Sequence, residues 1–176
     1  MLSAVGVLGG LALVPAAASK AIAASPRRTS VDSDARPSVS PAEFQAEYSD
    51  ATVLFPNELP FGYSFPGDVP ASSELPMPDR FRGDGEALAY VWWLVAAEHA
   101  SVAAFDRGDV DAQAYWLNVA SQFPLTEPRV LNVIDPSHEW ESAVLLPALE
   151  AADLEPMRTH INQSSVAPFL PAQASS

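Results

Sequence analysis

The stretch EALAYVWWLVAAEHASVAAFDRGD, residues 86–109, decides the fold. It holds a long apolar run with two adjacent tryptophans and ends at Gly108-Asp109. A run of this length predicts a helix that begins at Asp84 and is buried over most of its circumference. We expect Asp84 to cap its first turn and Gly108 to adopt the left-handed conformation that ends it. The stretch therefore predicts the central helix of a mainly α-helical protein.

A second helix follows directly and pairs with the first. Asp109 is expected to cap a helix over residues 110–123, which Pro124 stops. Its predicted apolar face consists of Ala112, Trp116, Val119 and Phe123, opposite Asp111, Asn118 and Gln122. Two helices joined by a Gly-Asp turn make an antiparallel hairpin. The fold class predicted is a small helical bundle built on this hairpin.

Shorter helices are expected on either side. Ser40 and Glu43 match a capping box with proline at the first helical position, which predicts a helix over residues 41–48. Residues 126–134 predict a short helix, although RVLNVI is also compatible with a strand. A last helix is expected from Asp135, with a kink or break at Pro147. Residues 162–176 are predicted to be a disordered tail, which leaves residues 41–161 as the helical domain.

A proline- and aromatic-rich segment spans residues 52–78, with prolines at 56, 60, 66, 70, 76 and 78. Helix and central strand are both excluded here, because proline lacks the backbone donor that each requires. Its apolar side chains are too many for a free linker, so we expect an extended strap that packs on the helices. They are Leu54, Phe55, Phe61, Tyr63 and Phe65. The alternative is a ligand for a separate peptide-binding domain.

The N-terminal residues predict where the protein is located. Residues 2–19 contain no charge, and AIAA at 21–24 offers a small-residue cleavage pattern. Residues 1–24 therefore predict a signal peptide, or an uncleaved membrane anchor that contacts the bilayer through residues 2–19. The basic residues lie after the apolar run instead of before it, so we expect a start codon further upstream. Residues 25–40 predict a disordered linker.

Charge and composition exclude several classes of function. Residues 37–176 carry five arginines against 20 acids, within a net charge of −13 for the whole chain. Such a surface repels phosphate backbones, so nucleic acid is not an expected partner. The chain contains no cysteine, which excludes disulfides, thiol catalysis and cysteine-bound metals.

The histidines are the first candidates for chemistry. His99 shares a helical stripe with Leu88, Trp92 and Val95, which favours a buried neutral imidazole over a metal ligand. His138 and Glu141 share a helix face, where acids near a helix start already complement its dipole. No nucleophile elbow or phosphate-binding glycine motif occurs. We therefore predict no catalytic residues, no metal site and no cofactor.

Aromatic residues are the candidates for ligand binding. Two adjacent residues on a helix cannot both face one core direction, so we expect Trp92 or Trp93 to lie under the strap or at a groove. Exposed aromatic faces also stack on sugars. The predicted ligand-binding residues are Trp93, Trp92, Tyr63 and Phe65.

Three segments, LPFGYSFP (59–66), AYVWWLVAAE (89–98) and RGDVDAQAYW (107–116), carry a resemblance. Together they resemble a group of uncharacterised exported actinobacterial helical proteins, over about residues 54–146. The resemblance implies export and a mostly helical domain, and it supplies no activity.

These observations predict an exported or membrane-tethered helical protein that binds an unknown protein or small ligand at the cell envelope. It is expected to be secreted or anchored to the outer face of the cytoplasmic membrane. The alternatives are an extracytoplasmic hydrolase using carboxylates with His138 or His99, and a spacer that self-associates through the strap.

Overall fold

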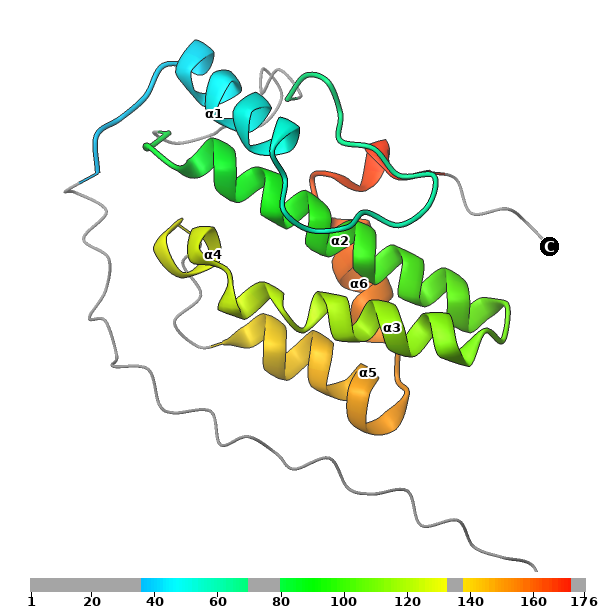
Figure 1. Cartoon of the computed structure of the whole chain (residues 1–176). Helices are drawn as coiled ribbons and strands as arrows, with labels where there is room; N and C mark the ends of the chain where they lie inside the picture. The colour runs from blue at the N-terminus through cyan, green and yellow to red at the C-terminus, as the bar shows by residue number, and fades with distance from the viewer. Residues whose placement is uncertain (1–35, 70–79, 133–137, 172–176) are drawn as a thin grey trace, which may run out of the picture.

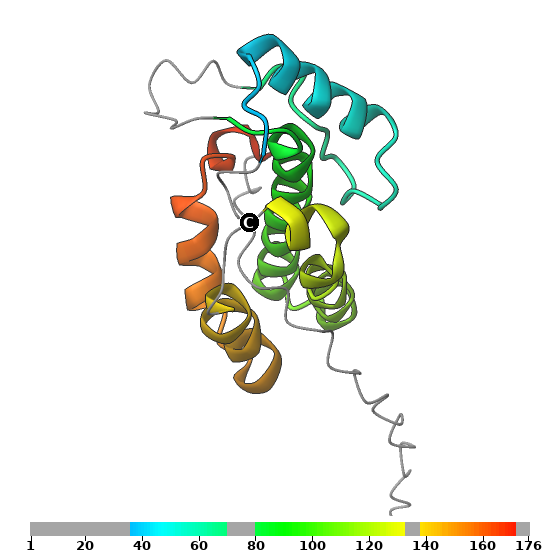
Figure 2. The ribbon, with the colours of Figure 1, turned by 90° about the vertical axis from the view of Figure 1, so that its left-hand side faces the viewer.

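The computed structural model describes residues 36–69, 80–132 and 138–171 (Figure 1). These residues fold into a small bundle of α-helices around α2 (Asp84–Asp106), as predicted. In Figure 2, α2 lies between α6 on one side and α3 and α4 on the other, with α1 across the top. The predicted signal peptide or anchor, residues 1–24, and most of the predicted linker lie outside the described residues.

The helix α2 forms the core of the bundle. Trp92, Trp93 and Val95 are at most 1% exposed, and residues 92–98 are buried without a break. Burying one large apolar side chain stabilises the fold by about 1.5–3 kcal/mol, so this run contributes much of the stability. By length and composition α2 would also pass as a membrane-spanning helix, a test that core helices meet as well, and 67% of its apolar stretch is buried.

The start of α2 differs from the prediction. The residue before the helix is Gly83, in the left-handed conformation at φ 90°, and Asp84 is the first helical residue. Asp84 accepts a hydrogen bond from the backbone N of Phe81 at 2.8 Å and forms an ion pair with Arg36 at 2.9 Å. The prediction that Asp84 caps α2 was therefore wrong, because its carboxylate faces the preceding turn and Arg36.

The helical hairpin is confirmed, although its second helix ends at Ala120, three residues before the predicted end. Gly108 adopts φ 70°, and Asp109 Oδ1 accepts from the backbone N of Ala112 at 3.1 Å, so it caps α3 (Val110–Ala120). The 3₁₀ turn η2 (Phe123–Leu125) follows, with Phe123 buried as expected. The next helix is α4 (Glu127–Asn132), which decides for helix over strand within these residues.

The helix α1 (Pro41–Val53) begins at the predicted capping box but runs five residues beyond the predicted end, so the exclusion of helix from residues 52–78 was wrong for Thr52 and Val53. Before it, Ser38 pairs with Phe81 in an isolated bridge and the backbone N of Arg82 donates to Pro37 O at 3.0 Å. Residues 36–40 are therefore fixed on the bundle, which corrects the predicted linker over that part.

The predicted break at Pro147 takes the form of a π-helical segment, η3 (Glu141–Leu145), that leads into α5 (Leu146–Ala151). The backbone N of Leu146 donates to Glu141 O, which is the wider π-helical spacing. Since Pro147 has no N–H, the change of spacing just before it accommodates the missing donor. Asp135, the predicted cap, lies outside the described residues.

The C-terminal part is more ordered than predicted. The helix α6 (Glu155–Gln163) buries Met157 and Ile161, and the turn η4 (Ala167–Phe169) follows Val166, which is 5% exposed. The predicted disordered tail is therefore wrong over residues 162–171. The physical reason is that these side chains pack onto the same core as α2.

Candidate functional site

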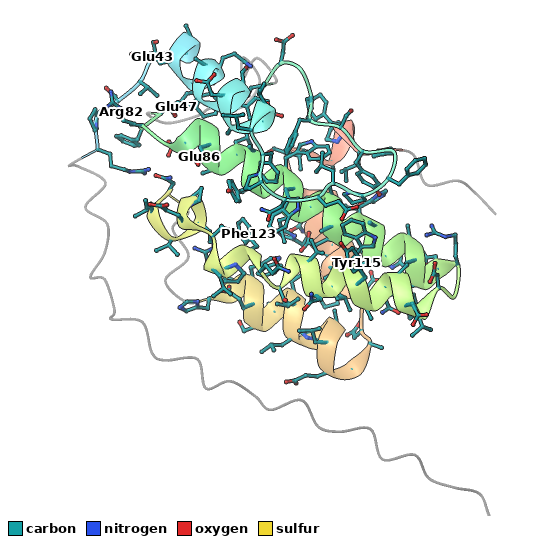
Figure 3. The ribbon with its side chains drawn as sticks, viewed as in Figure 1. Glu43, Glu47, Arg82, Glu86, Tyr115 and Phe123 are labelled. Carbon is teal, nitrogen blue, oxygen red and sulfur yellow. The ribbon has the colours of Figure 1, made fainter. Side chains whose placement is uncertain are left out.

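A groove of about 440 Å³ lies between α1 and the start of α2. It is lined by Glu47, Asp50, Ala51, Leu54, Pro56, Arg82, Gly83, Glu86 and Tyr90. The residues from α1 and Leu54, which directly follows it, are spaced i, i+3, i+4 and i+7, while α2 contributes an i, i+4 pair. Figure 3 shows Glu43, Glu47, Arg82 and Glu86 gathered at this end of the two helices.

The groove depends on a close approach of the two helices at Gly85. A Cβ atom built there would lie 2.5 Å from Phe44 O and 2.9 Å from Tyr48 N, both backbone atoms of α1. Only glycine leaves α1 room to touch α2 at this point.

A side chain of α1 also satisfies the first turn of α2. Glu47 Oε2 accepts from the backbone N of Gly83 at 3.0 Å and of Gly85 at 3.3 Å. These donors have no partner within their own helix, so Glu47 takes the role predicted for Asp84.

Carboxylates face the groove from both helices. Glu47 and Asp50 stand on α1 and Glu86 on α2, whereas Arg82 is the basic residue among the described residues that line it. The region is thus electronegative, and a cation placed in the groove would reduce the repulsion between its two walls.

Tyr90 is the aromatic residue of the lining, and two other aromatic rings pack against it. Its ring lies 4.8 Å from that of Phe55 and 6.3 Å from that of Trp93, centroid to centroid. Burial, and then the charges of Glu86 and Glu127, raise the pKa of Tyr90. Its hydroxyl is therefore neutral at physiological pH, and its ring offers a surface on which a cation or an apolar side chain packs.

The predicted ligand-binding residues meet at a different place, where residues 54–69 cross α2. Phe65 lies 5.0 Å from Trp92 between ring centroids, and Trp93 Nε1 donates to Glu58 O at 3.0 Å. Both tryptophans are 1% exposed. The expectation that one of them lies under the strap is confirmed, and in this conformation neither ring face is open to a ligand.

Tyr63 belongs to the same interface between the strap and α2, where it contacts His99. Its hydroxyl lies 2.6 Å from His99 Nδ1, and the two rings are in edge contact. Burial lowers the pKa of His99 and raises the pKa of Tyr63 to about 12, so both groups are neutral at physiological pH. The bond then runs from the phenol to the unprotonated ring nitrogen, as expected of a partly buried neutral histidine.

The strap packs on the helices as predicted, with two exceptions. Phe55, Leu59, Tyr63 and Phe65 pack against the core, whereas Leu54 is 82% exposed and Phe61 is 104% exposed. Phe61 is exposed because it occupies a turn that the backbone N of Tyr63 closes by donating to Pro60 O at 3.0 Å, with Gly62 at φ 86°. The predicted strap residues 70–78 lie outside the described residues.

His138 is the remaining predicted candidate for chemistry. Its side chain is 74% exposed, and Nδ1 lies 3.1 Å from Glu141 Oε1, although His138 itself, at φ 52°, precedes the helix that carries Glu141. Within the described ranges, no group of three or more histidine or acidic side chains is placed to hold a metal ion. The hydrolase alternative stays a prediction, with His138 beside one carboxylate and His99 beside a tyrosine.

Comparison with known protein families, with curated proteins and with solved structures finds no match to this chain. Sequence reasoning missed the α1–α2 groove. The available signal was the spacing of Glu47, Asp50, Ala51 and Leu54, which places two carboxylates and two apolar residues on one helix face.

Proposed function

We propose that this protein is a binding module and that its partner is a basic protein segment held in the α1–α2 groove. The observation that carries the proposal is the lining of that groove, to which α1 contributes Glu47 and Asp50 and α2 contributes Glu86 and Tyr90. A segment with arginine or lysine beside an apolar residue fits this chemistry, because its charge and its apolar side chain both find partners there.

Charge complementarity favours this occupant over others. The excess of acids over residues 37–176 repels nucleic acid and anionic membranes but attracts basic protein surfaces. Leu54, which lines the groove, is 82% exposed, and its neighbour in the chain, Val53, is 81% exposed. They supply the apolar contact area that a charge pair at an exposed site lacks.

A peptide titration tests this function. The probe is a fluorescein-labelled twelve-residue peptide that alternates Arg-Leu-Lys, and its matched control carries glutamate at every basic position. We expect the basic peptide to bind and the acidic peptide not to bind, with fluorescence anisotropy as the readout.

Two double variants locate the binding. Asp50→Asn with Glu86→Gln removes two groove charges, and Asp111→Asn with Glu150→Gln removes two exposed charges elsewhere. The groove variant should weaken binding about five- to thirtyfold, from about 0.5–1 kcal/mol per exposed charge pair. The control should change it less than about twofold. Equal losses in both variants, or no binding of the basic peptide, would contradict the proposal.

We also propose that the chain is exported. Its support is the uncharged segment 2–19, the small residues at 21–24 and the resemblance to exported proteins. N-terminal sequencing of the natively expressed protein should find a chain that begins near residue 24 outside the cytoplasm. An intact Met1 on a cytosolic product would contradict export.

A further inference from the structure

A buried carboxylate lies at the middle of α2, on the side away from the strap. Glu98 is 0% exposed. Its Oε1 accepts from Trp140 Nε1 at 2.8 Å, and its Oε2 accepts from His160 Nδ1 at 2.8 Å. Trp140 directly precedes η3, and His160 lies on α6. The Glu98 carboxylate therefore links α2 to two elements that are distant from it in sequence.

This carboxylate needs a counter-charge. Removing an ion from water costs several kcal/mol unless a charged and hydrogen-bonded partner accompanies it. Trp140 donates a neutral hydrogen bond, and His160 is the partner that becomes positive on protonation. The His160 side chain is 33% exposed, so it exchanges protons with solvent while Glu98 stays buried.

The other basic side chains near Glu98 have partners elsewhere, so His160 is the group that supplies its counter-charge. Arg158, two residues earlier on α6, is bound to Asp106 at the end of α2 by two hydrogen bonds. His99, the residue after Glu98, bonds to Tyr63 on the strap side and is kept neutral by burial. Among the described side chains that donate a hydrogen bond to Glu98, His160 alone titrates near neutral pH.

We propose that the Glu98–His160 pair is a proton-dependent latch, which holds α6 against α2 while His160 carries its proton and loosens α6 when that proton leaves. The latch is independent of the α1–α2 groove, which is lined by other residues near the start of α2.

The sign of the pH dependence follows from the environment of His160. Burial lowers its pKa, but the hydrogen bond that His160 donates to Glu98 and then the charge of Glu98 outweigh burial, and the net effect raises the pKa of His160 above 6.5. A raised pKa in the folded state stabilises the fold fully below the ordinary value of about 6.5. That stabilisation is lost as the pH rises through the raised pKa, so α6 should loosen on the alkaline side.

Hydrogen exchange of the full chain tests the latch. Exchange of the α6 amides, corrected for the intrinsic effect of pH, should rise severalfold between about pH 6 and about pH 9. His160→Gln keeps a donor without the charge, so its exchange should be fast at both ends of this range. The matched control is His138→Asn, which removes an exposed imidazole at φ 52°, a conformation that asparagine tolerates. The control should behave like the wild type.

A second measurement holds even where His160→Gln does not fold. NMR titration of the wild-type histidine ring protons should place the pKa of His160 above that of free histidine, and the pKa of His99 below it. Protection of α6 that is equal at both ends of the pH range, or a His160 that titrates below about 6.5, would overturn the latch.

Discussion

The substitution Gly85→Ala sets helix propensity against tertiary packing. Gly85 lies in the first turn of α2 and is buried against α1. An added Cβ would lie 2.5 Å from Phe44 O, 2.7 Å from Glu47 Cβ and 2.9 Å from Tyr48 N. Two of these atoms belong to the backbone, so no side-chain rotation relieves the clash and α1 must move.

The gain in helix propensity and the cost in packing contribute differently to the stability of Gly85→Ala. Alanine is favoured over glycine within a helix by about 0.5–1 kcal/mol. Overpacking costs about 1–3 kcal/mol, and a shift of α1 also weakens the hydrogen bonds that the first turn of α2 donates to Glu47, at about 1 kcal/mol. We therefore expect a net loss of about 1–3 kcal/mol in the free energy of unfolding.

Urea unfolding measures this difference, and Gly67→Ala is the matched control. A Cβ at Gly67 meets nothing within 4 Å. The control should be neutral or more stable than the wild type by up to about 1 kcal/mol, since it restricts only the unfolded chain. A Gly85→Ala protein that is as stable as the wild type would refute the close approach of α1 and α2.

Three further substitutions test the strap and the hairpin in the same assay. Trp93→Phe should cost about 1–3 kcal/mol, because it leaves Glu58 O without its donor and opens a cavity; an unchanged midpoint would show that the strap does not cover this ring. Phe61→Ser should change stability by less than about 0.5 kcal/mol, since the ring is fully exposed, and a larger loss would mean that it packs on the fold. Asp109→Ala should cost about 1 kcal/mol through the lost cap of α3, and no loss would mean that Ala112 N finds another acceptor.

The parts of the fold that depend on local sequence could be predicted. The capping box at Ser40, the cap at Asp109 and the left-handed Gly108 each involve residues within four positions of one another. The length and apolar content of α2 likewise sufficed to identify the core helix.

Features that depend on distant partners could not be predicted. The first turn of α2 is satisfied by Glu47, which lies 36 residues earlier than Gly83, so Asp84 was the natural candidate from sequence alone. Glu98 looked like one polar residue in an apolar run, because its partners Trp140 and His160 lie 42 and 62 residues away.

The helix α6 was not predicted, although a local sequence signal for it was present. Leu154, Met157 and Ile161 follow a helical spacing and are all buried. Pro156, in the first turn, also suits a helix start.

The candidate site, too, could be predicted only where it depends on local sequence. That Trp92 or Trp93 lies beneath the strap could be predicted from their adjacent positions on α2, but the burial of both rings depends on how the strap packs. The groove joins residues of α1 and α2 that are more than 30 positions apart, and no local pattern pairs them.

The most direct test of the proposed function is an NMR titration of the ¹⁵N-labelled protein with the basic peptide. We predict that the backbone amides of Ala51, Arg82 and Glu86, which line the groove, shift most and lose their shifts in the groove double variant. Shifts concentrated instead on the strap amides of Tyr63 and Phe65, with the groove amides unmoved, would contradict binding between α1 and α2.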